Sequence, residues 1–253
     1  MQDVSNPTDR SSLRKLWLDI TAVITWGILL LKYAIDGTLY IPIHPSYYLL
    51  VTVTGGCSIL IGLFQSWRLY RGNFTAPQEL HASLLPRGIA TMLLLGTAIA
   101  GLIITPKLFT SQAAIQRGVS TDVTVTRSHT QAFHTNVRSD RTLVDWVRTL
   151  NNYPEPDAYL GQKANINGFV FYPKQLPANY LMLSRFVITC CAVDAYPVSI
   201  PVKFTGSRQT YHQDSWLQVK GQAIVETFVG NRQLVIEASE LKPIPAPKNP
   251  YQE

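Results

Sequence analysis

The residues best suited to chemistry lie in one short segment, residues 185–195, with the sequence RFVITCCAVDA. Cys190, Cys191 and Asp194 fall within five positions there, and two sulfurs with a carboxylate can bind a transition metal such as zinc. Adjacent side chains on a strand point to opposite faces, so both cysteines can bind one ion only if the strand ends or turns there. Residues 192–197 are suited to such a turn. The sequence therefore predicts a candidate metal site at these three residues.

Two other interpretations of the cysteine pair stay open. In the first, one cysteine is a small buried hydrophobic residue and the other lines a surface. In the second, the pair does thiol redox chemistry, although the chain has no CxxC motif. The five histidines are scattered rather than set at metal-ligand spacing. The sequence also contains no GxSxG, Walker or HExxH motif, so we expect a protein that is not an enzyme.

Asp19 is a second candidate, because it is a carboxylate inside an apolar run, where charged side chains are usually functional. It lies four residues after Lys15, so an ion pair on one helix face explains it as well as a role in conduction does. We keep Asp19 as a candidate ligand or partner contact.

The apolar residues that must position these groups are unevenly distributed. Residues 1–108 contain eight Lys or Arg and five Asp or Glu, whereas the remainder contains fourteen and eleven. Residues 16–35, 47–64 and 88–104 form three apolar runs, and about 17 to 20 residues suffice to cross a bilayer as a helix. Residues 1–108 are therefore predicted to form three transmembrane helices. The net charge of +6 forms no dense basic block, which gives no support for a nucleic-acid partner.

Basic residues near the three runs predict the topology in a plasma (inner) membrane. Six of them belong to the N-terminus or to the loop between the second and third runs: Arg10, Arg14, Lys15, Arg68, Arg71 and Arg87. Because such residues favour the cytoplasmic side, we expect a cytoplasmic N-terminus and an extracytoplasmic C-terminal part. A signal peptide fits less well, since the first run contains Asp19 and two further runs follow it.

Beyond the third run, residues 109–139 are rich in polar side chains and are predicted to be a linker. A short amphipathic helix over residues 140–152 is predicted next, with an N-cap at Ser139 or Asp140. Its apolar residues recur at helical spacing: Leu143, Trp146, Val147 and Leu150.

From Gly161 onward the apolar residues alternate, which is typical of strands. About five strands, one of them the apolar run over residues 181–191, suit a small all-β barrel of the oligomer-binding type. Gly168 and Gly221 lie inside these strands, where a coiled barrel needs bulges or bends. Residues 140–253 are therefore predicted to form an extracytoplasmic, oligomer-binding-like β domain, with an open sandwich as the alternative.

Barrels of this type can bind single-stranded nucleic acid by stacking bases on aromatic rings. Phe169, Phe171, Tyr172 and Trp216 are available for stacking in the sequence. The predicted side of the membrane argues against this function, and no nucleic-acid partner is expected.

Several motifs resemble the YcgQ-like family of small bacterial membrane proteins, which are regarded as permease subunits. The matching segments are residues 40–45 (YIPIHP), 159–162 (YLGQ), 168–170 (GFV), 185–195 (RFVITCCAVDA), 216–221 (WLQVKG) and 245–251 (PAPKNPY). They are spread over nearly the whole chain, from residue 40 to residue 251, and residues 185–195 are the most specific part. This sequence departs from the family pattern between its second and third runs, where many members have a histidine-rich loop and this chain has only His81.

The resemblance implies a partner, a larger polytopic membrane permease, and a link to metal homeostasis. The expected function is an accessory subunit, anchored in the lipid bilayer by three helices, whose barrel contacts the permease or its ligand. Arg185 and Trp216 fall in the matching segments and join Asp19 as candidate ligand or partner contacts. The alternative is an extracytoplasmic metal- or ligand-binding domain that uses Cys190, Cys191 and Asp194.

Overall fold

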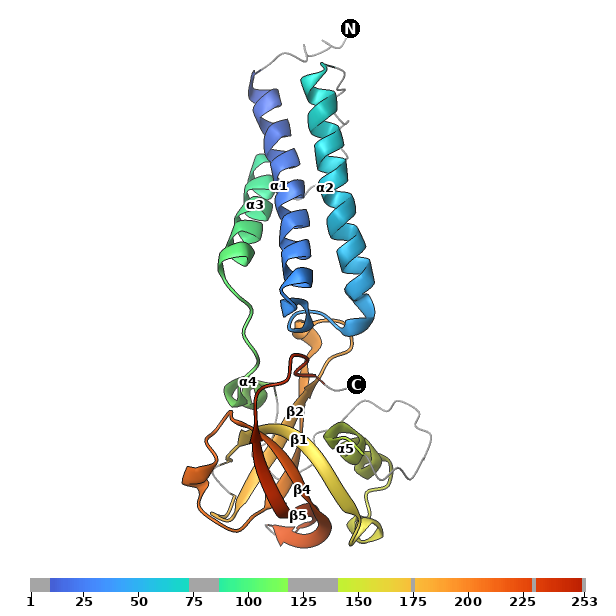
Figure 1. Cartoon of the computed structure of the whole chain (residues 1–253), viewed down its shortest axis with the longest axis vertical. Coiled ribbons are helices and arrows are strands. Elements are labelled where there is room, and N and C mark those ends of the chain that lie inside the picture. Colours follow the sequence, from blue (N-terminus) through green and yellow to red (C-terminus); the bar gives the residue numbers. More distant parts are fainter. Residues whose placement is uncertain (1–9, 73–86, 118–140, 174–175, 229–230, 252–253) are drawn as a thin grey trace. The chain divides into compact units, whose positions relative to one another are not determined.

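A computed structural model describes residues 10–72, 87–117, 141–173, 176–228 and 231–251 (Figure 1). The chain divides into two compact units, Met1–Lys107 and Leu108–Glu253. The first is helical and the second is built on a five-stranded sheet.

The helical unit contains α1 (Arg10–Ile35), α2 (Tyr48–Tyr70) and α3 (Arg87–Ile103). All three predicted apolar runs are therefore helices. Within the described residues, two segments are long and apolar enough to cross a membrane, Leu13–Ile35 and Pro45–Tyr70. The third apolar helix, Gly88–Ile103, is shorter.

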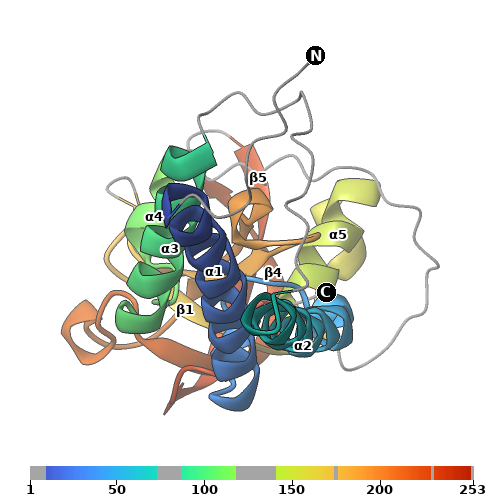
Figure 2. The same cartoon turned by 90° about the horizontal axis from the view of Figure 1, so that it is seen from above.

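Within this unit α1 lies between α2 and α3 (Figures 1 and 2). The contact with α2 depends on small residues, because a Cβ atom added to Gly27 would lie 2.8 Å from the Gly55 carbonyl oxygen. The contact with α3 includes two hydrogen bonds to backbone carbonyls: Trp26 Nε1 donates to Leu94 O at 2.9 Å, and the Tyr33 hydroxyl to Gly101 O at 2.7 Å.

The second unit contains α4 (Ser111–Gln116), α5 (Leu143–Asn152) and five strands. The strands are β1 (Lys163–Phe171), β2 (Tyr180–Val187), β3 (Tyr196–Lys203), β4 (Trp216–Phe228) and β5 (Asn231–Ile244). They form a closed sheet in the order β1-β2-β3-β5-β4. Each neighbouring pair is antiparallel except β3 and β5, which are parallel over a short stretch. The five predicted strands are confirmed.

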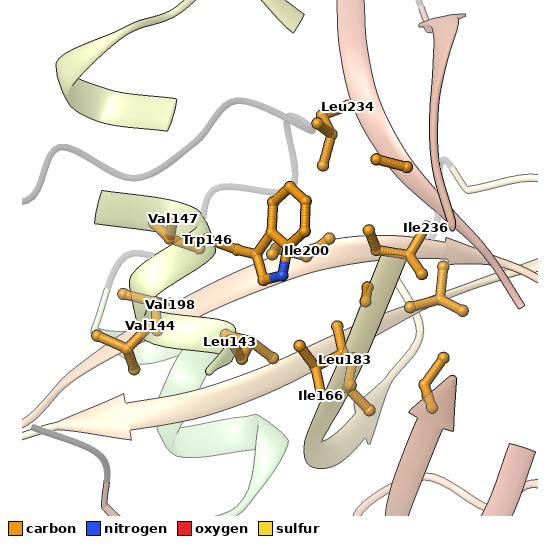
Figure 3. Packing of buried hydrophobic residues seen from close by; sticks show 14 of the residues in the cluster. Leu143, Val144, Trp146, Val147, Ile166, Leu183, Val198, Ile200, Leu234 and Ile236 are labelled. Carbon is orange, nitrogen blue, oxygen red and sulfur yellow. The ribbon is translucent and has the colours of Figure 1, made fainter. Parts of the chain in front are cut away.

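Helix α5 fills one side of the main core. The predicted apolar residues Leu143, Trp146, Val147 and Leu150 are all buried, and Figure 3 shows Trp146 and Leu143 pointing toward residues of the strands, such as Ile200 and Ile236. The helix begins later than predicted, at Leu143, because Thr142 and Asp145 form a reciprocal capping box.

The two glycines predicted at bends lie where neighbouring backbones approach closely. The β4–β5 register shifts between Lys220 and Gly221, and a Cβ atom on Gly221 would lie 2.1 Å from Glu237 O. A Cβ atom on Gly168 would lie 2.5 Å from Ser184 O. Glycine is therefore needed at both points, and the bulge predicted at Gly221 is confirmed.

A second apolar cluster lies on the other face of β1 and β2. It contains Phe169, Phe171, Phe186, Trp216 and Tyr251, and Phe109 packs against it. Residues 109–117 of the predicted linker thus include α4 and belong to the packed domain. The rest of that predicted linker, residues 118–139, lies outside the described residues.

Candidate functional site

Cys190, Cys191 and Asp194 lie in a tight loop between two strands, because β2 ends at Val187 and β3 begins at Tyr196. The predicted strand over residues 181–191 therefore ends before the cysteines. A short 3-10 helix, Ala192–Asp194, turns the chain within the range predicted for a turn. This turn brings Asp194 back toward the start of the loop.

The Asp194 carboxylate closes the loop. Its oxygens accept hydrogen bonds from the backbone N–H of Thr189 at 3.0 Å and from the backbone N–H of Cys190 at 2.7 Å. Burial alone would raise the pKa of Asp194, but hydrogen bonds from Thr189, Cys190 and Cys191 hold that pKa below its ordinary value. Asp194 is therefore a structural anion that fixes the loop backbone.

The two thiols lie side by side. Cys190 is exposed and Cys191 is half-buried, and their sulfur atoms are 3.6 Å apart, so no disulfide joins them. The pKa of Cys190 is raised to about 11, first by the hydrogen bond of its thiol to Asp194 and then by the hydrogen bond to Cys191. At neutral pH Cys190 is thus a protonated thiol and not a reactive thiolate.

The geometry does not fit the predicted metal site. Across the described residues, no group of three or more His, Cys, Asp and Glu side chains is placed to hold a metal ion. The carboxylate of Asp194 is engaged by backbone N–H groups. The loop brings the three predicted residues together, but as a hydrogen-bonded turn.

Arg117, which the sequence did not single out, fixes the other side of this loop. Its guanidinium donates hydrogen bonds to the carbonyl oxygens of Ala192 and Ala195, both at 2.8 Å. The same group lies 4.5 Å from the centre of the Phe109 ring. A single arginine in a polar stretch gives no periodic signal, which is why sequence reasoning missed it.

Arg185 and Trp216, predicted as ligand or partner contacts, are instead buried against each other. They are 5% and 9% exposed, and the guanidinium lies 4.8 Å from the centre of the Trp216 ring. Arg185 donates one hydrogen bond to Pro250 O at 3.2 Å, while its Nε has no partner among the described residues. Burial lowers the pKa of Arg185 to about 10.

The aromatic rings considered for nucleic-acid stacking are not on a free surface. Phe169, Phe171 and Trp216 are buried, and the Tyr172 hydroxyl donates to Tyr211 O at 2.7 Å.

Two segments cover this aromatic cluster. The ring centre of Phe109 lies 5.0 Å from that of Phe186, and Tyr251 forms a parallel bridge with Phe186. Asp214 holds the first segment in place, because its carboxylate accepts a hydrogen bond from Ser111 N at 2.6 Å. These positions carry no local motif, so only the fold reveals their proximity.

Asp19 lies within the helical unit and accepts a hydrogen bond from the Thr91 hydroxyl of α3 at 2.5 Å. Thr91 is buried. The predicted functional carboxylate thus takes part in the contact between α1 and α3.

A polar groove of about 770 Å³ lies elsewhere in the second unit, beside the β4 bulge. Its walls come from β1, β4, β5 and Thr205. Some of its polar side chains bond to each other, as Gln222 Nε2 does to Glu237 Oε2 at 3.3 Å. The residues that line the groove do not include those of the cysteine loop.

Comparison with known proteins adds one assignment. The model of the DUF1980 C-terminal domain matches residues 120–252, just over half of the 253-residue chain. Neither the curated proteins nor the solved structures contain a significant match. The chain therefore belongs to the DUF1980 C-terminal domain family.

Proposed function

We propose that this chain is a non-enzymatic accessory subunit of a larger polytopic membrane permease, anchored in the bilayer by its helical unit. The observation that supports this most is the combination of two membrane-length apolar helices with a separate, compact β domain. Membership of the DUF1980 C-terminal domain family is compatible with a membrane-associated accessory protein.

The apolar side chains of α2 support a position in lipid. Leu49 is 78% exposed and Leu60 is 67% exposed, although both are large and apolar. The segment Pro45–Tyr70 has 26 residues and so measures about 39 Å, more than the roughly 30 Å of a hydrocarbon core. In this proposal α3 is a third, shorter span, since a bilayer can adapt to a short helix at modest cost.

Three spans and the flanking basic residues lead to the proposed topology, with a cytoplasmic N-terminus and an extracytoplasmic β domain in the plasma (inner) membrane. Arg14 and Lys15 then lie on the same side as Arg68 and Arg71, as the distribution of positive charge favours.

The polar groups of the helical unit support an accessory role rather than autonomous transport. Asp19 and Thr91 bond to each other, and Trp26 bonds to a backbone carbonyl of α3. These bonds join α1 to α3, and Asp19 is the one carboxylate in the three apolar runs of the sequence, which is too few for an ion pathway of its own. The proposed permease supplies the pathway, as the resemblance to the YcgQ-like family also suggests.

For the β domain we propose an oligomer-binding-like barrel that contacts the permease or its ligand. The closed strand order and the parallel β3–β5 pair support this finer assignment. The buried aromatic cluster argues against nucleic acid as the ligand, because bases need exposed rings on which to stack. The polar groove beside β4 is the surface we favour for contact.

The proposal is tested by purifying the tagged chain from its native membrane in a mild detergent. We expect a polytopic membrane protein to co-purify in near-equal amount and to be cross-linked to the chain before extraction. Recovery of the chain alone, with no cross-linked neighbour, would contradict the accessory role.

Topology is tested separately with single cysteines in a variant that lacks the three natural ones. We expect a membrane-impermeant maleimide to label Gln209→Cys on intact cells and Arg71→Cys only after the cells are opened. The reverse pattern would contradict the orientation without affecting the proposed partnership.

A further inference from the structure

The cysteine loop has a chemistry that neither a metal site nor the accessory role explains. Cys190 and Cys191 are adjacent in sequence, both reach solvent, and their sulfur atoms are in contact at 3.6 Å. A disulfide bond is about 2.05 Å long, so the sulfurs need to approach by only about 1.5 Å.

We propose that Cys190 and Cys191 form a reversible disulfide with each other by exchange with an external small-molecule or protein disulfide. This inference does not depend on the proposed accessory function, because it rests on the geometry of the loop alone.

The reaction balances as two successive exchanges. One cysteine loses its proton to solvent, and its thiolate attacks a sulfur of the external disulfide R–S–S–R; a mixed disulfide forms and RS⁻ leaves. The second cysteine then loses its proton, attacks the mixed disulfide at the first cysteine and expels the second RS⁻. The pair is oxidised by two electrons, and the external disulfide is reduced to two thiols.

Proximity favours a disulfide between Cys190 and Cys191 over a disulfide to another molecule. Cys190 is exposed, so it can meet a second chain, but the Cys191 sulfur is already at contact distance. Groups held together in this way react as if one of them were present at very high concentration. The internal disulfide should therefore form before any dimer does.

Closing the bond must reshape the loop. Consecutive Cα atoms across a trans peptide are about 3.8 Å apart, whereas the Cα atoms joined by a disulfide are usually about 4.4 to 6.8 Å apart. Cys191 is now fully extended, with φ −154° and ψ 171°, and the Asp194 carboxylate binds the Cys190 N–H. We expect oxidation to disturb these bonds, and with them the hydrogen bonds from Arg117 to Ala192 and Ala195.

The test uses the full-length chain in detergent with Cys57→Ser, so that residues 190 and 191 are the remaining cysteines. The chain is equilibrated with mixtures of reduced and oxidised glutathione, then alkylated and cut with trypsin. We expect the peptide 186–203 to lose the mass of two hydrogen atoms as the mixture becomes oxidising, and to resist alkylation until it is reduced.

Cys190→Ser and Cys191→Ser are the matched controls. Each should remove the internal product and give a mixed disulfide with glutathione instead. Val193→Ala, an exposed residue of the same loop, should leave the oxidation midpoint unchanged.

Two results would overturn the proposal. In one, both cysteines stay open to alkylation under conditions that oxidise a free dithiol. In the other, oxidation gives only disulfide-linked dimers that a single Cys190→Ser change abolishes.

Discussion

The Asp194 carboxylate acts on Cys190 in two ways, because it accepts the backbone N–H at 2.7 Å and is the largest cause of the raised pKa of the thiol. One carboxylate therefore fixes the position of this cysteine and also suppresses its ionisation. At neutral pH Cys190, the more exposed of the two cysteines, is consequently a protonated thiol, which is less reactive than a thiolate.

Replacing Asp194 with Asn should make Cys190 more reactive. The amide keeps an oxygen for the backbone N–H groups but removes the negative charge, so the pKa of Cys190 should fall from about 11 toward its ordinary value. A larger fraction of Cys190 is then thiolate, but that thiolate is less nucleophilic because its pKa is lower. The net result should be an alkylation rate about tenfold higher at pH 8. The rate of alkylation of Cys190 by iodoacetamide against pH measures this in a Cys57→Ser background, with Cys190 and Cys191 distinguished by fragmentation of the peptide.

The control for that change is Val193→Ala, which should leave the pH profile where it is. An Asp194→Asn profile that coincides with the parent profile would show that the carboxylate does not control the thiol.

Replacing Arg117 with Met should loosen the cysteine loop. Methionine keeps an apolar stem beside Phe109 but removes the donors to Ala192 O and Ala195 O. Hydrogen bonds from charged donors contribute about 1.5 to 3 kcal/mol, and partial exposure places this pair near or below the lower end. Hydrogen exchange measured by mass spectrometry should be about tenfold faster in the peptic peptides that cover residues 188–195. The peptide that contains α5 serves as the internal reference, and equal acceleration in both would indicate general destabilisation instead.

Two glycines of the helical unit make a matched pair for stability. A Cβ atom on Gly27 would lie 2.8 Å from Gly55 O, whereas a Cβ atom on Gly56 would meet nothing within 4 Å. Gly27→Ala should therefore separate α1 from α2 and destabilise the unit by about 1 to 3 kcal/mol. Gly56→Ala should be neutral, or stabilising by up to about 1 kcal/mol through helix propensity. Thermal unfolding in detergent checks both, and equal midpoints would contradict close packing at Gly27.

Tyr251 should make the domain less stable at high pH. Burial raises the pKa of Tyr251 to about 12 in the folded chain, above the value of about 10 expected when unfolded. As the pH rises, the unfolded state releases the phenol proton first. The contribution of Tyr251 to the free energy of unfolding is therefore fully present below pH 10 and is lost as the pH rises toward 12. Tyr251→Phe has no phenol proton to release. Its free energy of unfolding should therefore fall by about 1 to 2 kcal/mol less than that of the parent over that range.

Denaturant unfolding at pH 8 and pH 11 measures this difference. Arg185 titrates in the same range with the opposite sign, but it is present in both proteins and its effect cancels. If the free energy of unfolding fell equally in the parent and the variant between pH 8 and pH 11, Tyr251 would be excluded as a source of the pH dependence.

Local patterns in the sequence predicted the elements well, and they did so for physical reasons. Helix α5 has a one-sided apolar face, and its four predicted core residues are buried because burying that face stabilises it. Four strands follow from alternation and β2 from a continuous apolar run, and Gly221 follows from the need for a bulge.

Contacts between residues far apart in sequence could not be predicted in the same way. Nothing near Arg117 indicates that its partners are Ala192 and Ala195, because the pairing depends on how the sheet closes. The contacts of Asp194 in the predicted metal site could not be foreseen for a related reason. Residue type and spacing showed that Asp194 would lie near the cysteines, but not that backbone N–H groups would bind its carboxylate.

The packing of Phe109 and Tyr251 beside Phe186 has a consequence for how the domain is made. A ribosome delivers Phe109 first and Tyr251 much later, so the aromatic cluster stays incomplete until nearly all of the barrel has been synthesised. During that interval Phe186 lacks part of its cover, and nascent chains should be at their most prone to self-association.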